Sequence, residues 1–196
     1  PSSLGRRPGE NQATARKGNL LDAGGMLLAV VAALLVSGLH YQWIIVGLVI
    51  GSAIGAVAAQ RVQMTAMPEM VALFNGAGGL ASLLVGWVEY HNHPAQPVAT
   101  TLPIFLAVLI GGVTLTGSVL AYAKLAEKIQ TRPILFPFQQ AINAGLLLLV
   151  LLCGFIFCAH PTSSYLIFLF IILLSLVLVV LAVIPIGGAD MPVVIA

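Results

Sequence analysis

Six apolar runs dominate the sequence, and each is close to the length that crosses a bilayer as a helix. They cover residues 20–39, 41–59, 69–88, 102–122, 142–159 and 164–186. A helix needs about 20 apolar residues to span the hydrocarbon core. Charged residues make up only 7% of the chain, whereas soluble domains carry about 25%. The sequence therefore predicts an all-α membrane protein, a bundle of about six transmembrane helices.

The basic residues predict how these helices are oriented. If the N-terminus lies inside, all 8 Lys and Arg residues fall in cytoplasmic segments and all 4 His residues fall outside. Short cytoplasmic loops are enriched in Lys and Arg, so a cytoplasmic N-terminus is predicted. Residues 1–19 form a juxtamembrane segment and residues 20–196 the transmembrane domain. The connections between the runs are short, so none of them could hold a soluble catalytic domain.

Polar residues inside two of the runs are the candidates for function. Asn75 interrupts the third run, and an amide within a membrane helix is costly unless it faces a partner or water. It lies six residues after Glu69, about 9 Å along a helix. The fourth run descends from the outer side, so Ser118 reaches a similar depth. Together with Thr114 and Gly117 it predicts the lining of a hydrated path; the alternative is that the hydroxyls bond to their own helix backbone.

Glycines in the second and third runs are interpreted as packing residues. Gly47, Gly51 and Gly55 are spaced by four, which places them on one helical face and favours close contact with another helix. Gly76 and Gly78 with Ala81 fit a loose dinucleotide-binding pattern. That motif requires a preceding strand and turn, and here it lies inside an apolar helix.

The remaining polar residues have simpler interpretations. Glu69 at the start of the third run is favourable near a helix N-terminus, and Asp190 in GGADMP is typical of a turn or cap before another helix. His91 and His93 form the closest pair of histidines, but only Glu89 could add a third ligand. No metal site is predicted.

Four stretches of the sequence resemble one known family. They are TARKGN (14–19), MTAMPEMVALFNGAGGLASLLVG (64–86), GGVTLTGSVLAYAKL (111–125) and IGGADMPVV (186–194). These stretches are similar to the membrane domain of the beta subunit of proton-translocating nicotinamide nucleotide (NAD(P)) transhydrogenase. They occur in the family's order from one end of the chain to the other.

The resemblance implies a role in an enzyme that couples hydride transfer from NADH to NADP+ with proton movement across a membrane. This chain would be the proton-channel domain, with Glu69, Asn75, Gly117 and Ser118 along the path; Thr114 joins them from its position in the fourth run. By the same resemblance, Asp190 would couple the path to the NADP(H) domain. Many relatives place a histidine at position 75, and asparagine cannot take up a proton near neutral pH.

The resemblance also implies which components lie outside this sequence. The NADP(H)-binding domain would follow the last membrane helix, so the chain is expected to be a fragment that holds no catalytic residues and binds neither NAD(H) nor NADP(H) itself. Its expected partners are the membrane helices and NAD(H) domain of an alpha subunit in a dimer of alpha-beta units. The expected location is the bacterial cytoplasmic (inner) membrane, with lipid and no nucleic acid around it.

Two questions stay open from the sequence. The titrating group of the path is expected from a histidine on an alpha-subunit membrane helix, and the rival is Glu69. A secondary transporter or a structural subunit of a membrane complex is the alternative function. A secondary transporter should show polar groups around a substrate cavity and often inverted repeats.

Overall fold

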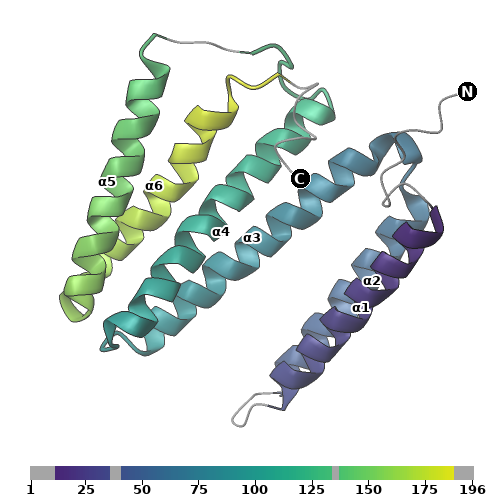
Figure 1. Ribbon diagram of the computed structural model, residues 1–196, viewed down its shortest axis with the longest axis horizontal. Coiled ribbons are helices and arrows are strands. Elements are labelled where there is room, and N and C mark those ends of the chain that lie inside the picture. The colour runs from purple at the N-terminus through teal and green to yellow at the C-terminus, as the bar shows by residue number, and fades with distance from the viewer. Residues whose placement is uncertain (1–11, 36–40, 134–136, 188–196) are drawn as a thin grey trace, which may run out of the picture. The chain divides into compact units, whose positions relative to one another are not determined.

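The computed structural model describes residues 12–35, 41–133 and 137–187. Within these ranges the regular elements are all helices, which confirms the all-α prediction (Figure 1). The chain divides into two compact units, residues 1–60 and 61–196. The elements are α1 (Gln12–Leu34), α2 (Tyr41–Arg61), the 3-10 turn η1 (Met64–Ala66), α3 (Met67–Asn92), α4 (Val98–Leu125), α5 (Gln139–Ala159), the 3-10 turn η2 (Pro161–Ser163) and α6 (Tyr165–Val183).

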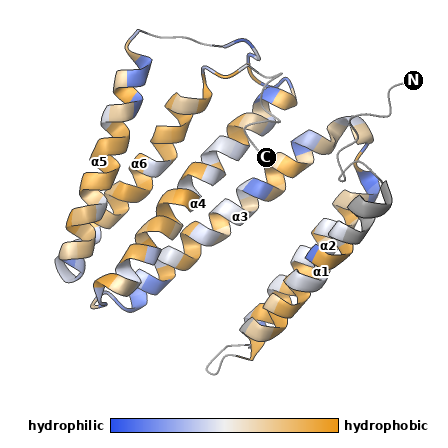
Figure 2. Ribbon diagram, viewed as in Figure 1, coloured by the Kyte–Doolittle hydropathy of each residue, from blue (hydrophilic) through white to orange (hydrophobic). Residues whose placement is uncertain are grey.

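Five helices, α2 to α6, are long and apolar enough to cross a membrane. Figure 2 shows that apolar residues cover most of their length, with hydrophilic residues mainly toward the ends. In α1 the apolar stretch Leu20–Ala32 is shorter, and residues 36–39 of the first predicted run lie outside the described residues. The protein is thus a multi-pass membrane protein, while the sixth span and the cytoplasmic N-terminus remain predictions.

In the first unit, the Tyr41 hydroxyl donates a hydrogen bond to the backbone carbonyl of Leu34 (3.0 Å). The α2 glycines Gly47, Gly51 and Gly55 have no described atom within 4 Å of where a Cβ would lie. The described chain therefore supplies no partner for this glycine face, and its packing role stays a prediction.

In the second unit, α3 and α4 form an antiparallel pair, and α6 packs against α4 with α5 beside it (Figure 1). The buried residues of α3 recur at alternating spacings of four and three. This spacing keeps a single seam facing one neighbour, as in the packing of helices that cross at a small angle. The seam consists of Ala72, Gly76, Gly79, Leu83, Gly86 and Tyr90.

Glycine lets the two backbones touch along this seam. A Cβ added to Gly79 would lie 2.8 Å from the carbonyl oxygen of Gly111, and one added to Gly111 would lie 2.6 Å from the carbonyl oxygen of Gly79. Small residues are the usual means of close helix approach in membranes, where dispersion contacts rather than hydrophobic burial drive association. Gly78, one residue away, has no described atom within 4 Å of a Cβ.

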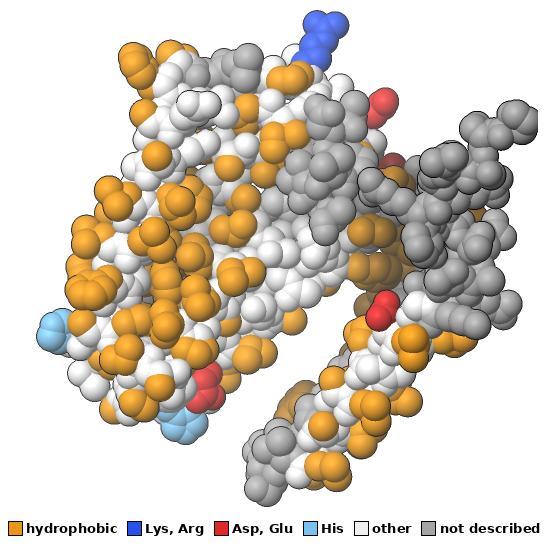
Figure 3. Space-filling model, in the orientation of Figure 1, with side chains coloured by type: hydrophobic (Ala, Val, Ile, Leu, Met, Phe, Trp, Pro, Cys, Tyr) orange, Lys and Arg blue, Asp and Glu red, His pale blue; other side chains and the backbone are white. Residues whose placement is uncertain are grey.

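The opposite ends of the second unit differ in chemistry. At one end, Tyr90 packs edge-on against Phe157, with ring centroids 4.8 Å apart, and against Phe168 at 4.6 Å. The Tyr90 hydroxyl donates to the carbonyl of Pro161, which ties α3 to the turn between α5 and α6. Figure 3 shows His side chains at this end and basic side chains at the other.

We expect Gly79→Ala to destabilise the protein and Gly78→Ala to leave it unchanged or stabilise it. Alanine raises helix propensity by about 1 kcal/mol at either position, but at Gly79 overpacking is expected to cost about 1–3 kcal/mol. Unfolding of the two variants in the same detergent mixture measures the difference. Equal stabilities would contradict the backbone contact at Gly79.

Candidate functional site

The polar residues that interrupt α3 and α4 meet across the seam. The Asn75 side-chain Nδ2 donates a hydrogen bond to the Ser118 hydroxyl oxygen at 3.1 Å. Ser118 is buried, with 4% of its surface exposed, whereas Asn75 is exposed on the surface of the described unit. The amide therefore bonds to α4 on one side while it faces away from the unit on the other.

Glycine allows this hydrogen bond to form. A Cβ on Gly76, the residue after Asn75, would lie 3.1 Å from the Cβ of Ser118. Such a contact is tighter than nearly all Cβ contacts in proteins. The sequence NG in the third apolar run thus supplies both the donor and the space for its acceptor.

The pair lines a cavity of about 180 Å³ between α3, α4 and α6. Thr114 and Gly117 of α4 also line it, so the structure brings four of the predicted path residues together. Val113, Val179 and Val183 supply the apolar part of the wall. No Asp, Glu, His, Lys or Arg is among the described residues that line the cavity.

The neighbouring hydroxyls differ in what they can do. The Thr116 hydroxyl donates to the carbonyl of Gly112, one turn earlier in α4 (3.0 Å), which is the self-bonding arrangement that Ser and Thr adopt in helices. Ser118 instead accepts from another helix. Thr116 therefore bonds to its own helix backbone, whereas the Ser118 hydroxyl can take part in a polar path.

The two candidate carboxylates are placed differently. Glu69 lies in the first turn of α3 and is partly buried. It is absent from the cavity wall as described, and six residues of helix separate it from Asn75, about 9 Å. Asp190 lies outside the described residues, so its coupling role stays a prediction.

Two further polar residues were not singled out by the sequence. Lys124, with 2% of its surface exposed, lies at the end of α4 and donates to backbone carbonyls beyond α6. Asn143 in α5 has a buried Oδ1 atom without a hydrogen-bond donor among the described residues. The sequence signal that could have identified Lys124 is its position just after a long apolar run. The signal for Asn143 is an amide within the fifth apolar run.

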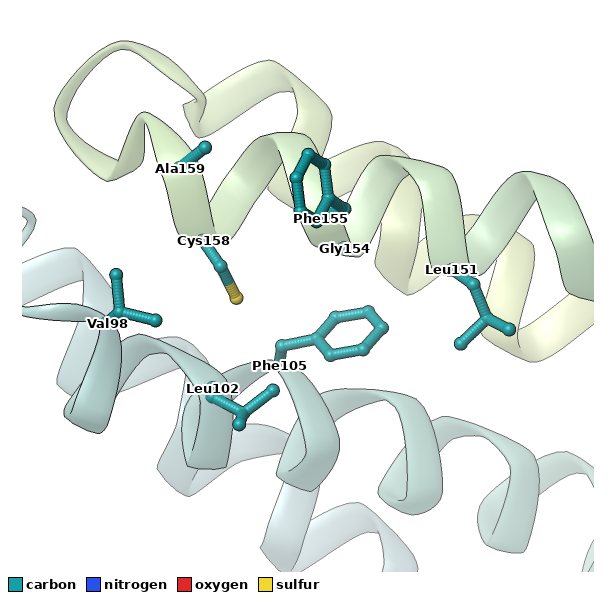
Figure 4. A pocket seen from close by; sticks show the side chains of 8 residues that line it. All are labelled: Val98, Leu102, Phe105, Leu151, Gly154, Phe155, Cys158 and Ala159. Atoms are coloured by element: carbon teal, nitrogen blue, oxygen red, sulfur yellow. The ribbon is translucent and has the colours of Figure 1, made fainter.

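A second cavity, of about 450 Å³, lies elsewhere in the second unit. Figure 4 shows it between α4 and α5, with Phe105 and Leu102 facing Gly154 and Cys158. Its lining is apolar apart from the Cys158 thiol. It therefore offers no group for proton transfer, and the smaller polar cavity is the candidate site.

Comparison with known proteins identifies the family. The family model for the NAD(P) transhydrogenase beta subunit matches residues 9–196. The chain belongs to this family. It is 38% identical over 195 residues to NAD(P) transhydrogenase subunit beta of Rhodospirillum rubrum, and the same values hold for that subunit from a defined strain of the species.

The transhydrogenase match covers 95% of this chain and 42% of the Rhodospirillum rubrum subunit. The chain thus spans less than half the length of these relatives. The resemblance inferred from four sequence stretches is confirmed, and the helices show that this is a membrane part of the beta subunit.

We expect Asn75 and Ser118 to be energetically coupled. A double-mutant cycle with Asn75→Ala and Ser118→Ala should give an interaction free energy of about 0.5–1.5 kcal/mol, as for hydrogen bonds between membrane helices. Reversible unfolding in mixed micelles measures it. Thr116→Val is the control, because its hydroxyl bonds to its own helix; equal coupling of Asn75 to both hydroxyls would contradict the pairing.

Proposed function

We propose that this chain forms part of the proton path of a proton-translocating NAD(P) transhydrogenase. In that enzyme, hydride transfer from NADH to NADP+ is coupled to proton movement across the membrane. The observation that supports the proposal is the hydrogen bond between Asn75 and Ser118 beside a cavity with hydroxyl and amide groups. Polar groups at this depth are costly in a bilayer, and they mark ion and proton pathways in membrane proteins.

The chemistry of the cavity suits a chain of hydrogen bonds better than proton storage. Asn75 uses Nδ2 toward Ser118, which leaves its carbonyl oxygen free to accept from a water molecule or a partner. The Ser118 hydroxyl accepts from Asn75 and can donate its own hydrogen onward. Neither group exchanges protons near neutral pH, so the titrating group must come from elsewhere.

We place that titrating group on the alpha subunit, as a histidine on a membrane helix that faces Asn75. Asn75 is exposed on the described unit, and an amide at this depth requires a polar neighbour or water. The rival donor, Glu69, lies at the start of α3. It is too far from the amide to reach it without intervening water.

The size of the cavity argues against the alternative of a secondary transporter. Small-molecule sites usually have volumes of about 300–1,000 Å³, while the polar cavity is about 180 Å³. The cavity of about 450 Å³ between α4 and α5 has the size, but apart from the Cys158 thiol its apolar lining offers no side-chain polar group to hold a solute. A structural subunit would explain the glycine seam, but it would not require an amide paired with a hydroxyl beside a cavity.

The proposal includes the rest of the enzyme. NAD(H) and NADP(H) bind to domains outside this chain, and Asp190 couples the membrane path to the NADP(H) domain. The membrane helices of the alpha subunit adjoin Asn75, and alpha-beta units form a dimer. The Rhodospirillum rubrum relatives are bacterial, which supports a location in the cytoplasmic membrane of a bacterium.

The complete enzyme in sealed vesicles should change the pH of one compartment when NADPH and an NAD+ analogue are added. The expected signal is a pH gradient that forms with hydride transfer and collapses on addition of a protonophore. A pH-sensitive dye and nucleotide absorbance measure both processes together. Hydride transfer without any pH change would contradict the proton path.

Asn75→His should restore part of the proton movement that is lost when the proposed alpha-subunit histidine is replaced. An imidazole at position 75 would supply the missing proton acceptor near neutral pH. Asn75→Gln in the same background is the control, because it keeps the amide. Absence of rescue, together with loss of pumping in Glu69→Gln, would assign the titrating role to Glu69.

A further inference from the structure

Lys124 joins the end of α4 to the end of α6 through a buried ammonium group. Its Nζ donates to the carbonyl oxygens of Val183 (3.2 Å), Ile184 (2.7 Å) and Ile186 (2.5 Å). A lysine ammonium has three hydrogens to donate, so all three are used by one short stretch of backbone. Only 2% of the Lys124 surface is exposed.

The end of α6 needs such a donor. The last carbonyls of a helix have no partner within the helix, and Pro185, two residues after the last helical residue Val183, has no backbone N–H. Ile184 N–H and Ile186 N–H bond to the carbonyls of Val180 and Val183, both at 3.0 Å. From a different helix, Lys124 adds a second donor to the Val183 carbonyl and supplies donors to the carbonyls of Ile184 and Ile186, which follow the end of α6.

Lys124 is not needed to close its own helix. At the end of α4, Lys128 N–H bonds to the carbonyl of Ala123 (2.9 Å) and Glu127 N–H to that of Lys124 (3.2 Å). Glu127 has a positive φ of 53°, so this is the left-handed Schellman ending that completes a helix locally. The lysine side chain is therefore free to act between helices.

Electrostatics favour the same arrangement. Helices α4 and α6 run in the same direction, and their C-terminal ends lie close together (Figure 1). Each end carries a partial negative charge from the helix dipole, and a cation there is stabilising. The buried ammonium thus reduces repulsion between two like ends.

One residue connects this contact to the polar cavity. The Val183 side chain lies in the wall of the cavity that contains Asn75 and Ser118, and the Val183 carbonyl accepts from Lys124. Ser118 and Lys124 both belong to α4, six residues apart. The position of the cavity wall on α6 is therefore fixed relative to the α4 groups that line the same cavity.

We propose that Lys124 is a positioning residue for proton coupling, which holds the end of α6 against α4. It keeps Val183 in the cavity wall and holds the chain after α6 as far as Ile186, four residues before Asp190 in the sequence. A structural change at the cavity can then reach the chain that follows α6, and the reverse, through the contact between Lys124 and Val183. This inference rests on the proposed proton path.

The test compares Lys124→Met, Lys124→Gln and Lys124→Arg in the complete, reconstituted enzyme. Lys128→Met is the matched control, since Lys128 is an exposed lysine near the same helix end that bonds to the Tyr122 hydroxyl (2.7 Å). Two quantities are measured: hydrogen–deuterium exchange of the Ile184 and Ile186 amides, and the number of protons moved per hydride transferred. Hydrogen bonds to a buried charge are strong, so exchange in Lys124→Met should be at least about tenfold faster.

The number of protons moved per hydride transferred distinguishes a positioning role of Lys124 in proton coupling from a role in stability alone. We expect the proton-to-hydride ratio to fall at least about fivefold in Lys124→Met and Lys124→Gln, and to recover to within about twofold in Lys124→Arg, which keeps the buried cation. Lys128→Met should change both quantities by less than about twofold, as expected for an exposed pair. Should Lys124→Met not assemble, Lys124→Gln against Lys124→Arg gives the same comparison.

Two results would overturn the inference. Unchanged amide exchange in the Lys124 variants would show that the ammonium does not hold α6, and faster exchange with a wild-type proton-to-hydride ratio would reduce Lys124 to a structural anchor. Failure of the proposed function gives a different pattern. The wild-type enzyme would then transfer hydride without moving protons, whereas the exchange difference at α6 would persist.

Discussion

The direct contact between the backbones of α3 and α4 is the constraint on which the rest of the second unit depends. Without hydrophobic exclusion from water, membrane helices hold together through close packing and hydrogen bonds. Gly79 and Gly111 allow the approach, and only at that separation can the short side chains of Asn75 and Ser118 meet. The polar site is thus a product of the glycine seam.

The sequence predicted the helices, and it placed Asn75 and Ser118 at similar depths, because both follow from simple geometry. Spanning length and lack of charge determine α2 to α6, and the helical rise from each end places Asn75 and Ser118 at similar depths. The sequence did not distinguish Gly78 from Gly79, since that difference depends on which face of α3 meets α4. It also could not tell that Thr116 bonds to its own helix while Ser118 accepts from another.

Lys124 shows why part of the site was beyond sequence reasoning. A lysine at the end of an apolar run ordinarily extends toward the aqueous interface, so the sequence indicates only an orientation for Lys124, as for the other Lys and Arg residues. Its three acceptors lie about sixty residues later in the chain. Only the three-dimensional proximity of two helix ends reveals that the ammonium closes a helix other than its own.

The outward-facing position of Asn75 has a consequence for the biogenesis of the protein. Asn75 is exposed on the described unit, and leaving part of its amide without hydrogen bonds in an apolar surrounding costs about 1–3 kcal/mol by protein mutational measures. That penalty disappears once a polar neighbour or water covers the group. Assembly in the membrane therefore favours a neighbour that offers this amide a hydrogen bond, and an apolar helix face packed over Asn75 would bear the penalty.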